Sequence, residues 1–173
     1  MMLVACIYRV IPARPYGFAP QLAIALFAGA VISNKKWAIL LPLFSMFFSD
    51  LLYHFMFTYK LGNVPGFYDG QWVNYLLYTG VILIGFLMKK ITIKNIALFS
   101  LIGPTAYFLS SNFVVWVGGG GWGRPKTFSG LLQCYEDGVP FYTMSLLSTL
   151  IFCTVLFGSW FLIYKKRETI AIQ

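Results

Sequence analysis

The composition of the 173-residue chain excludes an ordinary soluble domain. Hydrophobic residues make up 59% of the chain and charged residues only 10%, whereas soluble domains are about 25% charged. The mean hydropathy is +0.75. The net charge of +8 does not indicate nucleic-acid binding, because the lysines and arginines fall in small clusters between apolar runs and form no continuous basic stripe. A helical protein embedded in the lipid bilayer is expected.

Five apolar segments have, or nearly have, the length of a membrane span, which needs roughly 20 apolar residues to cross about 30 Å of hydrocarbon. A shorter apolar stretch at residues 1–12 precedes them. As a helix it would reach only about 18 Å, so it is a half-span, a tilted entry segment or the remnant of a longer start. In chain order the five segments cover roughly residues 18–33, 37–57, 71–88, 94–116 and 141–164.

These segments predict an all-α fold: a polytopic transmembrane helical bundle of about six helices, the first one short, in a single domain over residues 1–173. Basic residues in the short connections predict the orientation, because cytoplasmic loops carry the excess of them. The side with more of them, which includes the C-terminus, is expected to be cytoplasmic. It holds Lys35, Lys36, Lys89, Lys90, Lys94, Lys165, Lys166 and Arg167, against Arg9, Arg14, Lys60, Arg124 and Lys126 on the outer side.

The outer connections are longer and chemically more varied than the cytoplasmic ones. The longest runs from Val117 to Pro140, and structureless connections of more than about 12–15 residues in a compact domain are usually functional or disordered. This one contains Trp122, Phe128 and Tyr135, and disordered segments tend to lack aromatic residues. We expect it to fold back over the outer ends of the helices.

The stretch FSMFFSDLLYHFMF, residues 44–57, carries Asp50 and His54 within an otherwise apolar run. Asp50 lies about 10 Å inside the outer end of its expected helix. An acidic residue costs about 2.5–3.5 kcal/mol at the centre of a span and less nearer the surface, so ionisable groups there mark functional sites by default. His54 follows one turn later on the same face. The pair is expected to face the bundle interior or an aqueous cavity open to the outside.

The alternative is that Asp50 pairs with Arg9 or Arg14 as a structural lock, and that His54 only reaches the interface. The sequence leaves both interpretations open. A catalytic zinc site is not expected, because His54 is the only histidine and a third ligand is lacking. No metal or cofactor is therefore predicted.

A second polar group closes the segment at 94–116, in the stretch FLSSNFVVWVGGGGWGRP. The amide of Asn112 would need hydrogen-bond partners wherever it is buried. Trp116 and Trp122 bracket four glycines, and glycine lets the backbone approach a ligand or a neighbouring helix closely. Alternatively, the glycines form a flexible linker and the tryptophans are interface aromatics, which are common in membrane proteins.

Small residues recur along one stripe of the run QLAIALFAGA. Ala25 and Gly29 are four residues apart, and Ala28 extends the stripe. Small residues at this spacing let another helix approach closely in lipid. The neighbour is either another helix of the same bundle or a helix of a partner protein.

Four stretches together resemble an uncharacterised family of small bacterial membrane proteins: RPYGFAPQLAIALFAGA, PLFSMFFSDLLYH, FLSSNFVVWV and GLLQCYEDGVPFYTMSLLSTLIFCTVLFG. That family is similar in size, helix number and topology to the substrate-capture (S) subunits of energy-coupling-factor (ECF) vitamin transporters. The resemblance implies an S-component-like protein of the bacterial inner (plasma) membrane, which binds a vitamin or a metal ion under its outer loops.

The resemblance also implies docking, through small residues on a helix, onto a transmembrane coupling subunit that separate ATPases drive. Ala25, Ala28 and Gly29 are the residues expected to make this partner-helix contact. S subunits carry the small-residue motif on their first helix, whereas here it falls on the second apolar segment. Either residues 1–12 are not a true span, or docking uses another surface.

The leading hypothesis is a solute-binding subunit for uptake, with a pocket at the outer helix ends. Polar groups would fix the ligand, Arg and Tyr side chains would close over it, and tryptophans would supply apolar walls. A structural or accessory subunit of an envelope complex is the alternative. An enzyme ranks third, because no nucleophile elbow, metal cluster or cofactor fingerprint is present. The residues predicted to bind ligand are Asp50, His54, Asn112, Trp116, Trp122, Arg124, Tyr135 and Arg14.

Overall fold

The computed structural model of the chain describes residues 8–9, 11 and 15–171. Within this part the chain is all-α, which confirms the expected fold class, with five helices rather than about six. Most of residues 1–12, where a short first helix was expected, lies outside the described residues. The helices are α2 (Gln21–Val31), α3 (Lys35–Thr58), α4 (Gln71–Phe86), α5 (Ile93–Gly118) and α6 (Phe128–Ala171).

Three of the helices, α3, α5 and the part of α6 up to Ile163, are long and apolar enough to cross a membrane. In an apolar 18-residue stretch of each of these helices, at most 28% of the residues are buried inside the protein. Apolar side chains that the protein itself leaves uncovered need an apolar solvent, because water would penalise so much exposed hydrocarbon. These helices therefore indicate a membrane protein, with α2 and α4 as shorter apolar helices beside them.

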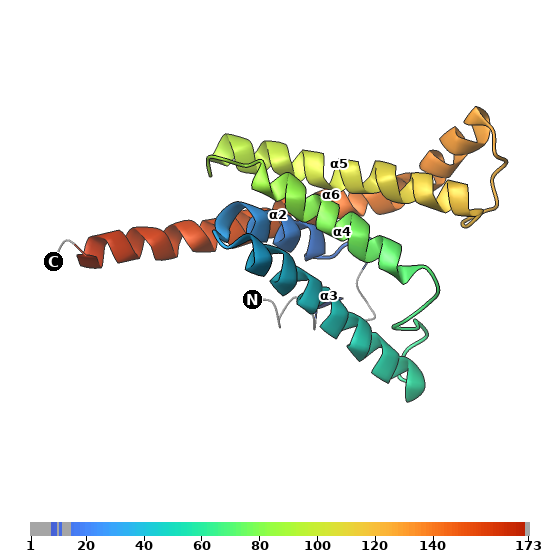
Figure 1. Ribbon diagram of the computed structural model, residues 1–173, viewed down its shortest axis with the longest axis horizontal. Coiled ribbons are helices and arrows are strands. Elements are labelled where there is room, and N and C mark those ends of the chain that lie inside the picture. Colours follow the sequence, from blue (N-terminus) through green and yellow to red (C-terminus); the bar gives the residue numbers. More distant parts are fainter. Residues whose placement is uncertain (1–7, 10, 12–14, 172–173) are drawn as a thin grey trace.

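The connections between the helices lie at two opposite ends of an elongated bundle (Figure 1). The α2–α3 and α4–α5 connections lie at the same end as the last turns of α6, which project beyond the other helices. The α3–α4 and α5–α6 connections lie at the opposite end, apart from each other. Lys35, Lys36, Lys89, Lys90 and Lys94 thus lie on or beside connections at one end of the bundle, the lysine-rich end, whereas Lys60, Arg124 and Lys126 lie on connections at the other end.

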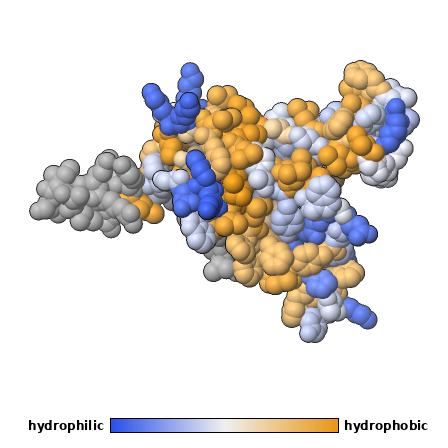
Figure 2. Space-filling model, viewed as in Figure 1, coloured by the Kyte–Doolittle hydropathy of each residue, from blue (hydrophilic) through white to orange (hydrophobic). Residues whose placement is uncertain are grey.

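Apolar surface covers the middle of the face shown in Figure 2, and hydrophilic residues gather toward its ends. At the end with the α2–α3 connection, the ammonium nitrogen of Lys35 lies 4.1 Å from the ring centroid of Phe86 at the end of α4. Lysines can cover apolar surface with their stems while the charge stays in water. An apolar belt between polar ends is the surface expected of a bundle that spans a bilayer.

Two of the long helices, α3 and α5, start at the lysine-rich end, and each has a side-chain N-cap. Asn34 accepts hydrogen bonds from the backbone N–H groups of Lys36 and Trp37 at the start of α3. Thr92 accepts one from the N–H of Asn95 at the start of α5. Both caps satisfy N–H groups that lack a partner within the first turn of a helix.

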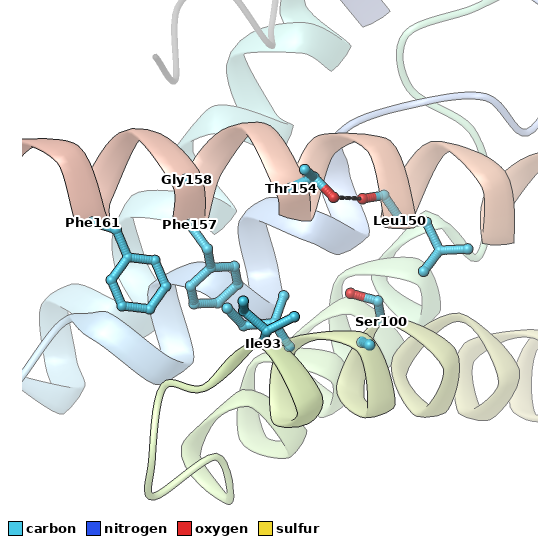
Figure 3. A pocket seen from close by; sticks show the side chains of 9 residues that line it. Ile93, Ser100, Leu150, Thr154, Phe157, Gly158 and Phe161 are labelled. Atoms are coloured by element: carbon cyan, nitrogen blue, oxygen red, sulfur yellow. Dashed lines mark hydrogen bonds between the residues drawn. The ribbon is translucent and has the colours of Figure 1, made fainter.

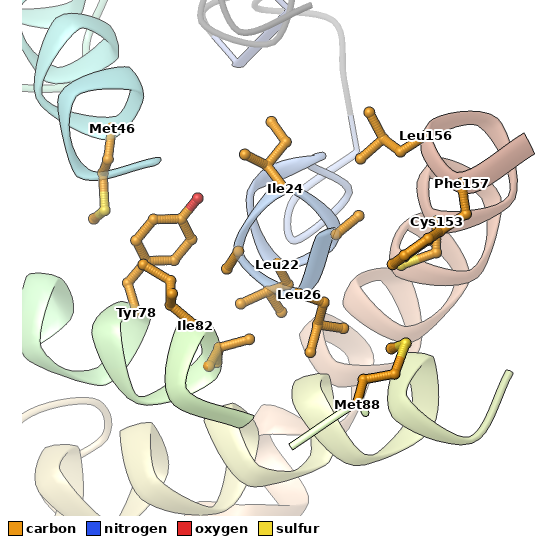
Figure 4. Close-up of a cluster of buried hydrophobic side chains, with 13 residues drawn as sticks. Leu22, Ile24, Leu26, Met46, Tyr78, Ile82, Met88, Cys153, Leu156 and Phe157 are labelled. Atoms are coloured by element: carbon orange, nitrogen blue, oxygen red, sulfur yellow. The ribbon is translucent and has the colours of Figure 1, made fainter. Parts of the chain in front are cut away.

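α2 forms the centre of the bundle and contacts all four other helices. Eight of its eleven residues are buried, as expected of a helix that is apolar on every side. Figure 4 shows its side chains meeting Tyr78 and Ile82 of α4 on one flank and Cys153 and Phe157 of α6 on the other. The bundle core is therefore built around this short helix.

Glycines allow α2 and α4 to cross at close range. A Cβ atom on Gly29 would clash with the carbonyl oxygen of Ile82, and one on Gly85 would lie 2.7 Å from the carbonyl oxygen of Leu26. Ala25 and Ala28, on the same stripe as Gly29, are 0% and 1% exposed. The small-residue stripe therefore packs within the bundle, and a partner helix could contact it only if α2 and its neighbours separated.

The expected long outer connection from Val117 to Pro140 is wrong in its second half. α6 begins at Phe128 and contains Pro140, so the connection after α5 is confined to residues 119–127. Figure 1 shows the first turns of α6 at an angle to the rest of the helix, in keeping with a proline that removes one backbone hydrogen bond. Glycine, proline and acidic residues give this helical segment the composition of a loop.

Replacing Gly29 by leucine is expected to destabilise the bundle by about 1–3 kcal/mol or more, since the added side chain meets α4 backbone that cannot move aside. Gly80 is a matched control on α4, because a Cβ there meets nothing within 4 Å. Thermal unfolding in detergent should show a lower Tm for Gly29→Leu and a nearly unchanged one for Gly80→Leu. Equal Tm values for the two variants would contradict the close crossing.

Candidate functional site

Asp50 is the centre of a buried polar cluster between α3 and α4. Its side chain is 2% exposed, and its Oδ1 atom lies 2.5 Å from Nη1 of Arg9. The same guanidinium donates to the carbonyl oxygen of Met46 at 3.3 Å and lies 5.6 Å from the ring centroid of Tyr53, whose hydroxyl donates to the carbonyl oxygen of Arg9. The pairing with Arg9, one of the two alternatives for Asp50, is thus present.

Two side chains of α4 complete the coordination of the Asp50 carboxylate. Gln71 Nε2 donates to Asp50 Oδ2 at 2.6 Å, and the Tyr75 hydroxyl donates to the same oxygen at 2.5 Å. Gln71 also donates to the carbonyl oxygen of Gly66 at 3.0 Å. Buried charges are tolerated where they are paired and hydrogen-bonded in this way. The cluster therefore fastens Arg9, α3, α4 and the α3–α4 connection to one another.

The sequence did not single out Gln71 and Tyr75. They are polar residues four apart at the start of an apolar helix, which puts them on one face, and this spacing is the signal that could have identified them. Their importance depends on contact with Asp50, which is more than 20 residues away in the chain. Long-range contact of that kind is not visible in a single sequence.

His54 does not share a site with Asp50. A Cβ atom on Gly66 would clash with the backbone of both residues, so the α3–α4 connection packs directly against the α3 backbone at this turn. His54 is exposed, its ring is 5.5 Å from that of Phe67, and it lines a shallow cavity of about 280 Å³ that includes Phe55. The structure thus places Asp50 in the bundle interior and His54 at the surface, and the alternative of an aqueous cavity open to the outside stays a prediction.

A second polar cluster holds the α5–α6 connection. Arg124 donates to both carboxylate oxygens of Asp137, from Nε and Nη2, each at 2.8 Å. This hydrogen-bonded pairing raises the pKa of the Arg124 guanidinium above its usual value, because the carboxylate stabilises the charged form. A bidentate pair of this type fixes geometry as well as charge. It ties the glycine-rich connection to the first turns of α6.

The two tryptophans at this end, Trp116 of α5 and Trp122 of the connection, differ in their surroundings. Trp116 Nε1 donates to the carbonyl oxygen of Pro125 at 2.9 Å, and the ammonium nitrogen of Lys126 lies 5.3 Å from its ring centroid. Trp122, in contrast, is 80% exposed. Gly119, Gly121 and Gly123 all have positive φ angles, which glycine adopts without strain. The connection is thus a defined turn rather than a linker without contacts.

The remaining predicted residues of this region contact the α5 backbone. The Asn112 amide donates to the carbonyl oxygen of Phe108 at 2.9 Å, and the Tyr135 hydroxyl donates to the carbonyl oxygen of Leu109 at 3.1 Å. A Cβ on Gly138 would lie 2.5 Å from Asn112 Oδ1, so α5 and α6 are close here. Arg14, also predicted to bind ligand, lies outside the described residues.

The structure therefore divides the predicted ligand-binding residues between two places. Asp50 belongs to the α3–α4 cluster, whereas Asn112, Trp116, Arg124 and Tyr135 belong to the α5–α6 end. Figure 1 shows these two connections apart at the same end of the bundle. Ligand contact by any of them stays a prediction.

A cavity of about 360 Å³ lies between α5 and α6 nearer the lysine-rich end. Figure 3 shows Phe157 and Phe161 of α6 pointing toward Ile93 at the start of α5, with Ser100 further along the groove. The residues that line it carry no charge. Among the described residues, no group of three or more His, Cys, Asp or Glu side chains comes together to hold a metal ion. The groove thus suits apolar chains better than polar chemistry.

Comparison with known proteins gives a family but no function. The chain belongs to a family of unknown function (DUF6580), whose match covers residues 1–171. No curated protein and no solved structure matches. Any functional statement therefore rests on the chain's own residues.

Replacing Asp50 by asparagine is expected to destabilise the protein by about 3–5 kcal/mol, because it leaves the largely buried Arg9 guanidinium, 20% exposed, without its counter-charge. The double variant Arg9→Met/Asp50→Leu removes both charges and should recover most of this loss. Unfolding in mixed micelles measures the effect. The more exposed pair of Arg124 and Asp137 is the control, and Asp137→Asn should change stability much less. A double variant as unstable as the single one would contradict this account.

Proposed function

We propose that this member of the DUF6580 family is a solute-binding integral membrane subunit for uptake of a small molecule, vitamin-like or a metal ion. It would lie in the bacterial inner membrane with its C-terminus in the cytoplasm. Separate subunits, a transmembrane coupling protein and ATPases, would supply the energy. The solute would enter from the end that carries the α3–α4 and α5–α6 connections.

The observation that carries this proposal is the buried Arg9–Asp50 cluster. Asp50 lies fifteen residues after Lys35, about 22 Å along the helix from the lysine-rich end, and so well inside a hydrocarbon core of about 30 Å. Charged groups at such depth are rare and mark solute or ion pathways by default. A purely structural lock could use apolar packing at lower cost. The cluster supports a polar site inside an apolar bundle.

A second candidate is an accessory subunit of an envelope complex. Large aromatic side chains are exposed at or near the connections: Trp122 is 80%, Phe128 76% and Trp72 69% exposed. Aromatic residues and arginine are enriched at protein interfaces. These side chains favour a protein partner at the same end of the bundle.

Native mass spectrometry of the protein, gently extracted from its own membrane, tests the first proposal. We expect a retained small molecule or a co-purified coupling subunit with ATPases. A complex with other envelope proteins, without a small molecule or an ATPase, would support the second candidate instead. Absence of any retained solute and any coupling subunit would overturn the uptake proposal.

Tyr75→Phe is a mild variant for the same measurement, because it removes one hydroxyl from the Asp50 carboxylate and keeps the ring. The retained solute should be at least several-fold less abundant than in the unmodified protein. Tyr142→Phe is the matched control: its hydroxyl is hydrogen-bonded to Thr105 between α5 and α6, away from Asp50. Equal loss in both variants would show that the effect does not involve the Asp50 cluster.

A further inference from the structure

α2 begins inside the bundle rather than at its surface. Its 11 residues span about 16 Å, roughly half of a hydrocarbon core of about 30 Å. The non-helical residues just before it are held by hydroxyl groups: Ser145 donates to the carbonyl oxygen of Gly17 at 3.1 Å and Ser148 to that of Ala19 at 3.2 Å. Non-helical backbone at membrane depth occurs only where protein buries it or where it lines a cavity.

The start of α2 is buried but has no side-chain cap. Its N-cap residue is Pro20, no side chain there accepts a hydrogen bond, and its first turn contains no acidic residue. Gln21, Leu22 and Ala23 are only 9%, 8% and 0% exposed. The first N–H groups of a helix lack intrahelical partners and carry the positive end of its dipole. The buried end of α2 therefore favours an acceptor with negative charge.

An independent observation at the same place points to a ligand. Both polar atoms of the Gln21 side chain, Nε2 and Oε1, are buried and have no hydrogen-bond partner in the part of the chain that the structure describes. Buried side-chain amides in native proteins are nearly always paired, as Gln71 is with Asp50 and Gly66 in this chain. The first residue of α2 thus offers one free donor group and one free acceptor beside an uncapped helix end.

We propose that the start of α2, with the Gln21 amide, binds the carboxylate of a small organic anion. The backbone N–H groups of the first turn and Gln21 Nε2 donate to the carboxylate, and Gln21 Oε1 accepts from a hydroxyl or ammonium group next to it. Half-helix N-termini at membrane depth bind anionic groups of substrates in this way. This inference rests on the proposed solute binding and narrows the solute to a class.

The Asp50 cluster adjoins this position through α4. The Tyr78 hydroxyl donates to the carbonyl oxygen of Gln21 at 2.9 Å, and the Tyr75 hydroxyl donates to Asp50. Residues three apart lie on one face of a helix, with about 5–6 Å between their Cβ atoms. Arg9 is already paired with Asp50, so the helix end and the Gln21 amide supply the attraction for the anion.

Sodium lactate is a suitable probe, because it carries a hydroxyl group next to a carboxylate. The purified chain in lipid nanodiscs should unfold at a Tm raised by about 2–4 °C or more at saturating lactate. Lactamide, its neutral amide, and sodium chloride at equal ionic strength should leave the Tm unchanged. This comparison needs no variant, so it stands even if a substitution prevents folding.

Gln21→Met removes the amide and keeps the side-chain length. It should abolish the lactate shift, and the variant without lactate should be at least as stable as the unmodified protein, because an unpaired buried group is lost. Gln133→Met is the control, since this amide lies at the α5–α6 end beside Arg124, and it should retain the full shift.

No lactate shift in the unmodified protein, or an equal shift in Gln21→Met, would overturn the carboxylate site. The uptake proposal is tested by a different measurement, native mass spectrometry, so the two can fail independently. A neutral or cationic solute retained in native mass spectrometry, together with no lactate shift, would leave uptake standing and remove this inference. A Gln21-dependent lactate shift without any retained solute or coupling subunit would support the carboxylate site and overturn the uptake proposal.

Discussion

The close crossing of α2 and α4 is the constraint on which the rest of the structure depends. In lipid the hydrophobic effect does not drive helices together, so contact relies on small residues that let backbones approach. Gly29 and Gly85 meet at this crossing, and α2 then contacts every other described helix. Because the crossing fixes α4 against the central helix, it also sets where Gln71, Tyr75 and Tyr78 point. The polar sites are thus consequences of an apolar packing arrangement.

Polar side chains in this bundle form hydrogen bonds with backbone groups as well as with one another. Serines of α6 and Tyr78 of α4 donate to the carbonyl oxygens of residues 17–21, and Gln71 donates to that of Gly66. Each of these backbone groups lies in a non-helical stretch or at a helix start, where lipid offers no replacement for water. The hydroxyl and amide groups that interrupt the apolar helices therefore make the irregular segments possible.

The sequence predicted the helices well where hydropathy alone decides them. The segments at 18–33, 37–57, 71–88 and 94–116 correspond to α2, α3, α4 and α5 within a few residues, because a span must be apolar over its whole length. The start of α6 was missed, since residues 128–140 are helical although glycine, proline and acidic groups make them polar. Pairing of Asp50 with Arg9 or Arg14 was one of two interpretations that the sequence left open. Gln21 was not recognised, because its lack of hydrogen-bond partners becomes visible only in three dimensions.

The two ion pairs of the described residues limit which charged side chains could bind a solute. Arg9 is paired with Asp50 and Arg124 with Asp137, so these side chains can bind a charged solute only by giving up a partner. A helix terminus has no such competitor, since its N–H groups are fixed in place and carry partial charge without a counter-ion. Recognition at the start of α2 would thus leave both ion pairs intact. In that arrangement the charged residues would stabilise the shape of the site, and the backbone and an uncharged amide would contact the ligand.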